Sequence, residues 1–187
     1  MGEQLWRHAN GIDDADIHEK YEPKERSLSL GQVLFRDYNK KEAVTIIREM
    51  VDTLASRMRN EEKMCNMVSI FIGYSKQLGG FARRATLLSA TDDSQVLFDA
   101  IIEIYNRYIN DLPIRNIGIY FGGLVPASHQ QLDLFEDESK QNKRHNLQKA
   151  VDKLHNKYGN NSVLRASALL EESTIKERNE YIGGHKK

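Results

Sequence analysis

Four stretches in the central part of the chain alternate apolar with small or polar residues, the pattern of strands with at least one buried face. The first runs from Ser27 to Phe35, and the last, from Ile114 to Val125, alternates most regularly. Between them, residues 67–76 and 79–90 are separated by a short link that contains glycine, which predicts a hairpin.

Two further stretches repeat apolar residues at steps of three and four, which predicts helices with one buried face. The stripes consist of Ile46, Ile47, Met50, Val51, Leu54 and Met58, and of Val96, Leu97, Ala100, Ile101, Ile104, Tyr105 and Tyr108. Asn39 followed by Glu42 has the form of a capping box, and Asp92 followed by Gln95 resembles one. We therefore expect helices to begin at these two places.

The resulting order, β-α-β-β-α-β, predicts an α+β domain over residues 27–126. Such a domain has a four-stranded antiparallel sheet with two helices on one face, and its other face is open for a partner. Residues 1–26 are interpreted as an end piece and linker. In residues 140–187 a narrow stripe of Leu147, Val151 and Leu154 predicts a partly helical C-terminal tail that is mobile or loosely docked.

Composition narrows the possible functions. The 187 residues include 27 basic and 27 acidic side chains, so any binding of nucleic acid must come from a local basic face. The one cysteine, Cys65, excludes an internal disulfide framework and a multi-cysteine zinc site. No apolar stretch approaches the length of a membrane span, and the first residues lack the order of a signal peptide, so we expect a cytoplasmic protein without a membrane partner.

The sequence offers no catalytic constellation. The six histidines are scattered, no phosphate-binding glycine loop is present, and Cys65 fits a buried strand position, so we predict no catalytic residue, no metal site and no cofactor. The expected open sheet face and its loops instead collect Arg36, Lys76, Arg83, Arg84 and Arg115. Such cations suit a phosphate backbone, although a solvated face has the same composition.

Several motifs together resemble a known family. The stretch "SLSLGQVLFRDY" at 27–38, preceded by "GID" and "IHEKYEP", is similar to the junction of thumb and little finger in Y-family translesion DNA polymerases. The bacterial branch that includes the catalytic subunit of DNA polymerase V, the UmuC, ImpB and MucB type, is the most similar. "RNIGIYF" at 115–121 resembles its last little-finger strand, and the final "IGGHKK" resembles its C-terminus.

This resemblance implies a function in DNA repair and the SOS response to DNA damage. The family's little finger is a βαββαβ domain that grips primer-template DNA, which would make the five cations phosphate contacts. The palm carboxylates that hold two magnesium ions in the family have no counterpart here, so we expect a C-terminal fragment, beginning at the end of the thumb, that cannot synthesise DNA. The parent protein would be a magnesium-dependent DNA polymerase.

A pentapeptide, "QLDLF", formed by Gln131, Leu132, Asp133, Leu134 and Phe135, resembles the segment by which bacterial polymerases attach to the sliding clamp, the β subunit of DNA polymerase III. We assign residues 127–139 to clamp binding. The alternative is a loop whose leucines fold back on the domain.

Two other interpretations remain open at this point. An RNA-recognition module shares the βαββαβ order, and "GGFARRAT" carries its Gly-Phe-Ala, but Arg83 stands where a stacking aromatic residue is needed. A free-standing adaptor that binds the clamp without a polymerase is the second.

Overall fold

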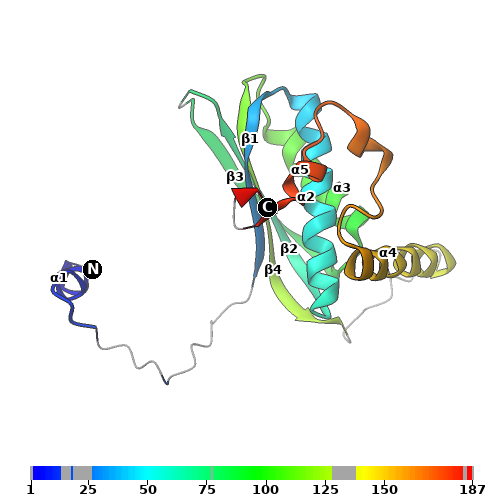
Figure 1. Ribbon diagram of the computed structural model, residues 1–187, viewed down its shortest axis with the longest axis horizontal. Helices are drawn as coiled ribbons and strands as arrows, with labels where there is room; N and C mark the ends of the chain where they lie inside the picture. The colour runs from blue at the N-terminus through cyan, green and yellow to red at the C-terminus, as the bar shows by residue number, and fades with distance from the viewer. Residues whose placement is uncertain are drawn as a thin grey trace.

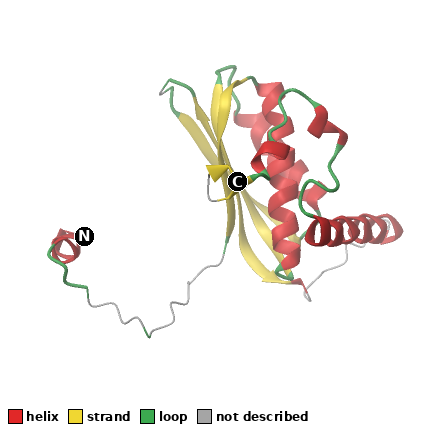
Figure 2. Ribbon diagram, in the orientation of Figure 1, coloured by secondary structure: helices red, strands yellow, loops and turns green. Residues whose placement is uncertain are grey.

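The computed structural model describes residues 2–13, 18, 27–76, 78–127, 138–182 and 185–186. A short helix, α1 (Gly2–Ala9), precedes the predicted domain, whose β-α-β-β-α-β order is confirmed. Its elements are β1 (Leu28–Tyr38), α2 (Lys40–Asn60), β2 (Lys63–Tyr74), β3 (Gly80–Thr91), α3 (Ser94–Tyr108) and β4 (Ile114–Pro126). Helices α2 and α3 lie side by side on one face of the sheet, as predicted (Figure 1, Figure 2).

The sheet has the order β1-β4-β2-β3, and every neighbouring pair is antiparallel. It follows that β1 and β2 run in the same direction with β4 between them, and that β3 and β4 do so with β2 between them. Each parallel pair is joined through a helix, α2 or α3. Two split β-α-β units are therefore interleaved in one sheet, with β1 and β3 at its edges.

The core lies between the sheet and the two helices. Ile70 of β2 and Ile119 of β4 are cross-strand neighbours, and both are buried under α2 and α3. The apolar stripe of α2 is buried along its whole length, from Ala43 to Met58. Burial of a valine, leucine, isoleucine or methionine side chain stabilises the fold by about 1.5 to 3 kcal/mol. The positions that face the sheet are therefore apolar, and the sequence shows them as helical stripes.

Helix α2 begins at the predicted capping box. The side chain of Asn39 accepts hydrogen bonds from the backbone N–H groups of Lys41 and Glu42, at 2.8 and 3.0 Å. In return, the Glu42 carboxylate accepts one from the N–H of Asn39 at 2.8 Å. The box thus satisfies three backbone donors that the first turn leaves without an intrahelical partner.

The predicted cap of α3 was wrong by one residue. Asp93, not Asp92, is the N-cap, and its Oδ1 accepts hydrogen bonds from the backbone N–H groups of Gln95 and Val96, at 2.7 and 3.4 Å. The carboxylate of Asp92 instead lies 3.7 Å from His145. Two adjacent acids before a helix look alike in sequence, and the backbone geometry decides which of them caps it.

Both edge strands contain a break in register. Between Val33 and Tyr38, β1 advances five residues while β4 advances two, from Asn116 to Ile114. On the opposite edge, β3 advances from Thr86 to Thr91 against two residues of β2. Leu88, inside this second break, is fully exposed.

The C-terminal tail is partly helical, as expected. It comprises α4 (Glu138–Tyr158), the 3₁₀ helix η2 (Ala166–Leu169), α5 (Ile175–Arg178) and two short paired strands, β5 (Tyr181–Ile182) and β6 (His185–Lys186). We expected this tail to be mobile or loosely docked, but from Arg144 onward it makes specific contacts with the domain, and Asp152 forms an ion pair with Arg59 of α2. Helix α4 lies across the C-terminal end of α2 (Figure 1).

Candidate nucleic-acid interface

The face of the sheet opposite the helices is defined by the strand register. Directly opposed residues of an antiparallel pair point to the same side, and the neighbours of buried residues along a strand point to the other. The open face, so defined, consists of Ser29, Gly31 and Val33 in β1, Asn116, Gly118, Tyr120 and Gly122 in β4, Met67, Ser69, Phe71 and Gly73 in β2, and Gly80, Ala82, Arg84 and Thr86 in β3. None of these residues is acidic.

One cross-strand row of this face consists of hydrogen-bonding side chains only. Ser29 opposes Tyr120, Tyr120 opposes Ser69, and Ser69 opposes Arg84. Strands lie about 4.8 Å apart, so four residues in a row span about 14 Å. Hydroxyl and guanidinium groups in such a row suit an extended chain of phosphates.

The next row is flat and apolar. Gly31 opposes Gly118, which opposes Phe71, which opposes Ala82. Phe71 is 46% exposed, and its ring leans over Gly118, where an added Cβ would lie 3.4 Å from the Phe71 side chain. The small residues on both sides of Phe71 leave the backbone accessible, so a ligand could approach it closely.

The two adjacent arginines of β3 lie on opposite faces. Arg84 is exposed on the open face, and within the described part of the chain its guanidinium makes no hydrogen bond or ion pair. Arg83 opposes buried Ile70, and its guanidinium lies over the ring of Tyr108 in α3, 4.9 Å from the centroid. The prediction that both lie on the open face is therefore wrong for Arg83.

Three other predicted cations gather where β1 and β2 end and β4 begins. Arg36 is engaged by the Glu42 carboxylate at 2.8 and 3.1 Å, a pairing that raises the pKa of the guanidinium. Arg115 lies 3.9 Å from Asp37. Lys76 is exposed in the β2–β3 turn at a φ of 53°, with no ion-pair partner among the residues described. Among the described residues, Lys76, Arg83 and Arg84 thus have no carboxylate beside them, but Arg83 lies on the helix side of the sheet.

Cys65 and the metal-ligating side chains are the other candidate groups for chemistry among the described residues. Burial raises the pKa of the Cys65 thiol to about 12, which makes it a poor nucleophile. Histidine, cysteine and acidic side chains form no cluster of three that could hold a metal ion within the described ranges. Among the helices described, none has the length and apolarity to cross a membrane. The predicted clamp-binding residues, Gln131 to Phe135, lie outside the residues that the structure describes.

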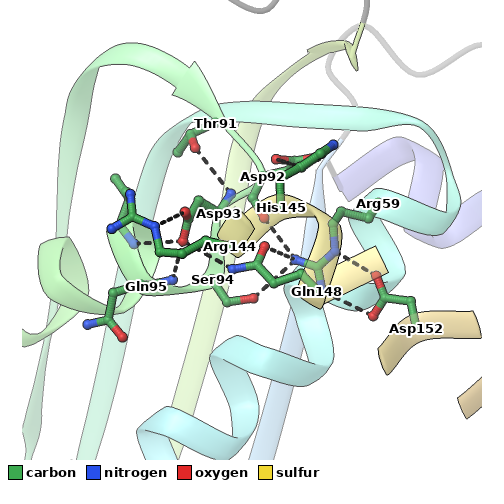
Figure 3. Close-up of polar contacts among 11 residues, drawn as sticks. Arg59, Thr91, Asp92, Asp93, Ser94, Gln95, Arg144, His145, Gln148 and Asp152 are labelled. Carbon is green, nitrogen blue, oxygen red and sulfur yellow. Dashed lines mark hydrogen bonds and ion pairs between the residues drawn. The ribbon is translucent and has the colours of Figure 1, made fainter. Parts of the chain in front are cut away.

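A buried polar network joins the tail to the domain, and the sequence did not predict it (Figure 3). Its centre is Arg59, near the end of α2, which forms an ion pair with Asp152 of α4. A second contact involves Glu49, which accepts hydrogen bonds from the Ser173 hydroxyl at 2.5 Å and from the Thr174 backbone at 3.2 Å. Glu49 and Arg59, together with Asp52 and Ser56, follow helical spacing along one side of α2, the only sequence signal of this second buried face.

The sequence itself has relatives. Residues 25–134 match the impB/mucB/samB family C-terminal domain. The chain belongs to this family.

Three relatives cover nearly the whole of this impB/mucB/samB family chain. UvrX of Bacillus subtilis, which carries the name of a UV-damage repair protein, is 31% identical over 100% of the chain and 45% of its own length. DNA polymerase IV 2 of the same organism is 28% identical over 100% of the chain and 45% of its own length. DNA polymerase IV of Clostridium acetobutylicum is 29% identical over 91% of the chain and 42% of its own length. The chain therefore spans less than half the length of these relatives.

The family match confirms the resemblance to Y-family polymerases of the UmuC, ImpB and MucB type and, with the observed sheet and helices, the little-finger fold. The position of Phe81 weakens the RNA-recognition interpretation. That interpretation would use the aromatic residue of "GGFARRAT" on the open face, but Phe81 opposes buried Ile72 on the helix side. Its ring lies 6.2 Å from that of Tyr108.

Proposed function

We propose that the chain is the DNA-binding C-terminal part of an error-prone translesion DNA polymerase, and that the open face of its little finger grips the primer-template duplex. The observation that carries this proposal is the composition of that face. It combines hydroxyl groups, glycines and Arg84, and it includes no acidic side chain to repel phosphate. The relatives named as DNA polymerases support the same assignment.

The geometry favours binding that depends little on sequence. The hydroxyl groups of Ser29, Ser69 and Tyr120 and the guanidinium of Arg84 suit phosphate oxygens, which carry no base information. A polymerase that extends past damage needs such a grip, because the bases beneath it change with every step. The proposed contacts are Arg84 on the face, Lys76 in the hairpin turn, and Arg36 and Arg115 at the end of the sheet. Arg83 lies on the helix side of the sheet and is left out of this set.

The second part of the proposal concerns the sliding clamp. The Gln131 amide both donates and accepts hydrogen bonds, and Leu134 and Phe135 can each contribute about 1.5 to 3 kcal/mol on entering an apolar pocket. Ordering the peptide and losing free motion offset much of this gain, which leaves binding around the micromolar range. Such weak binding suits an enzyme that must exchange with other polymerases on one clamp.

Nucleotidyl transfer is assigned to the part of the parent protein that lies outside this chain. There, carboxylates would hold magnesium ions, which supply the Lewis acid chemistry of the reaction. This chain contributes binding, and we propose that by itself it does not extend a primer. The parent would act in the cytoplasm, in DNA repair during the SOS response.

The test uses the purified chain. Fluorescence anisotropy with labelled primer-template duplexes of unrelated sequence should give similar affinities that fall with salt. Single-stranded RNA of the same length should bind more weakly, and no primer extension should occur with magnesium and nucleotides. Preference for RNA would contradict the DNA-binding proposal, and extension of the primer would contradict the division of labour.

A further inference from the structure

Phe71 is a half-exposed aromatic residue in the middle of the open face. It belongs to β2, one of the two central strands of the sheet, and it is 46% exposed. Its side chain leans over two glycines. An added Cβ at Gly118 would lie 3.4 Å from the Phe71 Cβ, and one at Gly73 would lie 3.3 Å from its Cζ. Glycine at these two positions lets the ring lie close to the sheet, with its outer side open to solvent.

A side-chain amide lies near the ring. Asn116 of β4 opposes Gly73, and the Cβ position that is 3.3 Å from the Phe71 Cζ is 3.1 Å from the Asn116 Nδ2. Within the described part of the chain, the Asn116 amide makes no hydrogen bond. An amide both donates and accepts hydrogen bonds. An aromatic ring with such a group beside it suits a nucleobase, which stacks through its face and hydrogen-bonds through its edge.

Positive charge lies on both sides of Phe71 along β2. Arg84 opposes Ser69, which lies on the same face two residues before Phe71, about 7 Å away. Lys76 lies beyond the other end of β2, in the turn toward β3. None of the residues that define the open face is acidic. A chain of phosphates that runs along β2 therefore meets a cation before and after the ring.

Tyr120 is seated in a similar way on β4, the other central strand. An added Cβ at Gly122 would lie 2.8 Å from its Cε1, so this ring also leans over a glycine two residues further along its own strand. Because β2 and β4 are antiparallel, the two rings lean in opposite directions. They therefore lie on opposite sides of the row that contains Ser69, and each central strand contributes one aromatic ring to the open face.

We infer that Phe71 is a stacking platform for an unpaired base of single-stranded DNA. Asn116 lies beside the edge of the stacked base, and Arg84 and Lys76 lie toward the phosphates on either side. Stacking of this kind tolerates any sequence, because every base has a flat face. The strand is DNA, because the neighbours of Phe71 in its row are glycine and alanine, whose side chains form no hydrogen bond with a 2′-hydroxyl.

This site goes beyond the proposed grip on the duplex. Bases in a duplex are paired and stacked on one another, so their faces do not reach a ring on the protein surface. Unpaired bases do reach it. Duplex and single strand thus share the cations of the open face, but only the single strand uses the Phe71 ring through its bases. A loss of affinity that is larger for the single strand separates this inference from the proposed function.

The experiment measures the affinity of the chain for two labelled single strands of equal length by fluorescence anisotropy. One strand carries thymine at every position, and the other consists of abasic sugar-phosphate units with the same charge. Stacking of one base on an aromatic ring is worth roughly 5- to 150-fold in affinity. The unmodified chain should therefore bind the thymine strand at least about fivefold more tightly than the abasic strand.

Phe71→Ala should remove this preference and leave the salt dependence unchanged, because no charge is lost. Phe71→Leu keeps an apolar side chain without a flat ring and should also lose the preference. Gly73→Ala keeps the ring but places a methyl group against it, so the preference should weaken. Arg84→Ala should weaken binding of both strands and keep the preference. Leu88→Ala, at a fully exposed position within the register break of β3, is the matched control and should bind both strands as the unmodified chain does.

Three results would overturn the inference. The first is equal affinity of the unmodified chain for the thymine and abasic strands, and the second is a preference that persists in Phe71→Ala. The third is a loss of duplex affinity in Phe71→Ala as large as the loss for the thymine strand, since the ring would then contact the sugars of the backbone. Tighter binding of a uracil RNA strand of the same length would overturn the assignment to DNA. Duplex affinity of the unmodified chain tests the proposed function separately, and a chain that binds duplex without any base preference keeps that function and loses this site.

Discussion

Arg83 and Arg84 are neighbours in β3, but Arg84 opposes Ser69 on the open face of the sheet and Arg83 opposes Ile70 on the face that the helices cover. The guanidinium of Arg83 stacks on Tyr108, whereas Arg84 points away from the helices. Two residues that look interchangeable in the sequence therefore have different surroundings. This pair provides the sharpest test of which face binds DNA.

Arg84→Ala should weaken duplex binding about equally for unrelated sequences. Loss of one phosphate contact should also reduce the slope of log affinity against log salt by about 1. Arg83→Ala, the matched control, should leave the slope unchanged, because its charge faces the helix side at the edge. Anisotropy titrations over a series of salt concentrations measure both. Equal losses from the two variants would contradict the assignment of the open face.

Leu134→Ala combined with Phe135→Ala should abolish clamp binding, since the two apolar anchors are removed together. Duplex affinity should be unchanged, because the sheet lies in residues 28–126. Glu136→Ala combined with Asp137→Ala changes the adjacent positions outside the motif and serves as the control. Surface plasmon resonance on immobilised clamp measures the effect, and retained clamp affinity in the first variant would end the clamp assignment.

Asp93→Ala should destabilise the domain more than Asp92→Ala. Asp93 caps α3, and the loss of an N-cap typically costs about 0.5 to 2 kcal/mol of unfolding free energy. Its carboxylate also contacts Arg144 and Gln148, so the loss should fall in the upper part of that range. The contact between Arg59 and residue 92 uses the backbone carbonyl, which Asp92→Ala preserves. Urea denaturation of the two variants decides the order, and a larger loss from Asp92→Ala would restore the sequence-based assignment.

Glu49 should make stability fall with rising pH. Burial raises the pKa of its carboxyl above the usual range, although Ser173 and Thr174 donate hydrogen bonds to it. Between the ordinary glutamate pKa, about 4.3, and the raised value, the folded state holds more protons than the unfolded state, so the unfolding free energy declines across that window. Each unit of elevation corresponds to about 1.4 kcal/mol.

The measurement is urea denaturation at several pH values from about 4 upward. The free energy of unfolding of the unmodified chain, relative to that of its Glu49→Gln variant, should decrease as the pH rises, because glutamine does not ionise. Glu103→Gln, at an exposed position of α3, is the control. If the difference in unfolding free energy between the unmodified chain and Glu49→Gln stays constant or grows with pH, then burial does not outweigh the hydrogen bonds in setting the pKa of Glu49.

Local sequence signals predicted the elements well. The Asn39 and Glu42 box placed the start of α2 to the residue, because a cap depends on a few side chains close in sequence. The apolar stripes of α2 and α3 predicted which side of each helix is buried, and the regular alternation in β4 did the same for that strand. Both signals arise because packing against one layer repeats apolar residues with the period of the element. The open face followed from the element order, since two helices cover one side only.

Relations between distant segments were harder to predict. The order β1-β4-β2-β3 depends on pairings across the whole domain, which no single strand specifies. The faces of Arg83 and Arg84 depend on the register of an edge strand, whose sequence "GGFARRAT" has too few apolar residues to reveal its buried side. The docking of α4 was missed because Arg59 and Asp152 form a polar contact, and hydrophobic periodicity carries no information about it.

The two register breaks at the edges of the sheet bear on how copies of the molecule meet one another. A sheet that keeps one face uncovered and has two regular edges could pair with other sheets and grow into fibrils. Here β1 is interrupted between Val33 and Tyr38, and β3 between Thr86 and Thr91, so neither edge presents a long uniform row of unpaired backbone groups. The irregular edges therefore make edge-to-edge pairing between copies of the sheet less favourable.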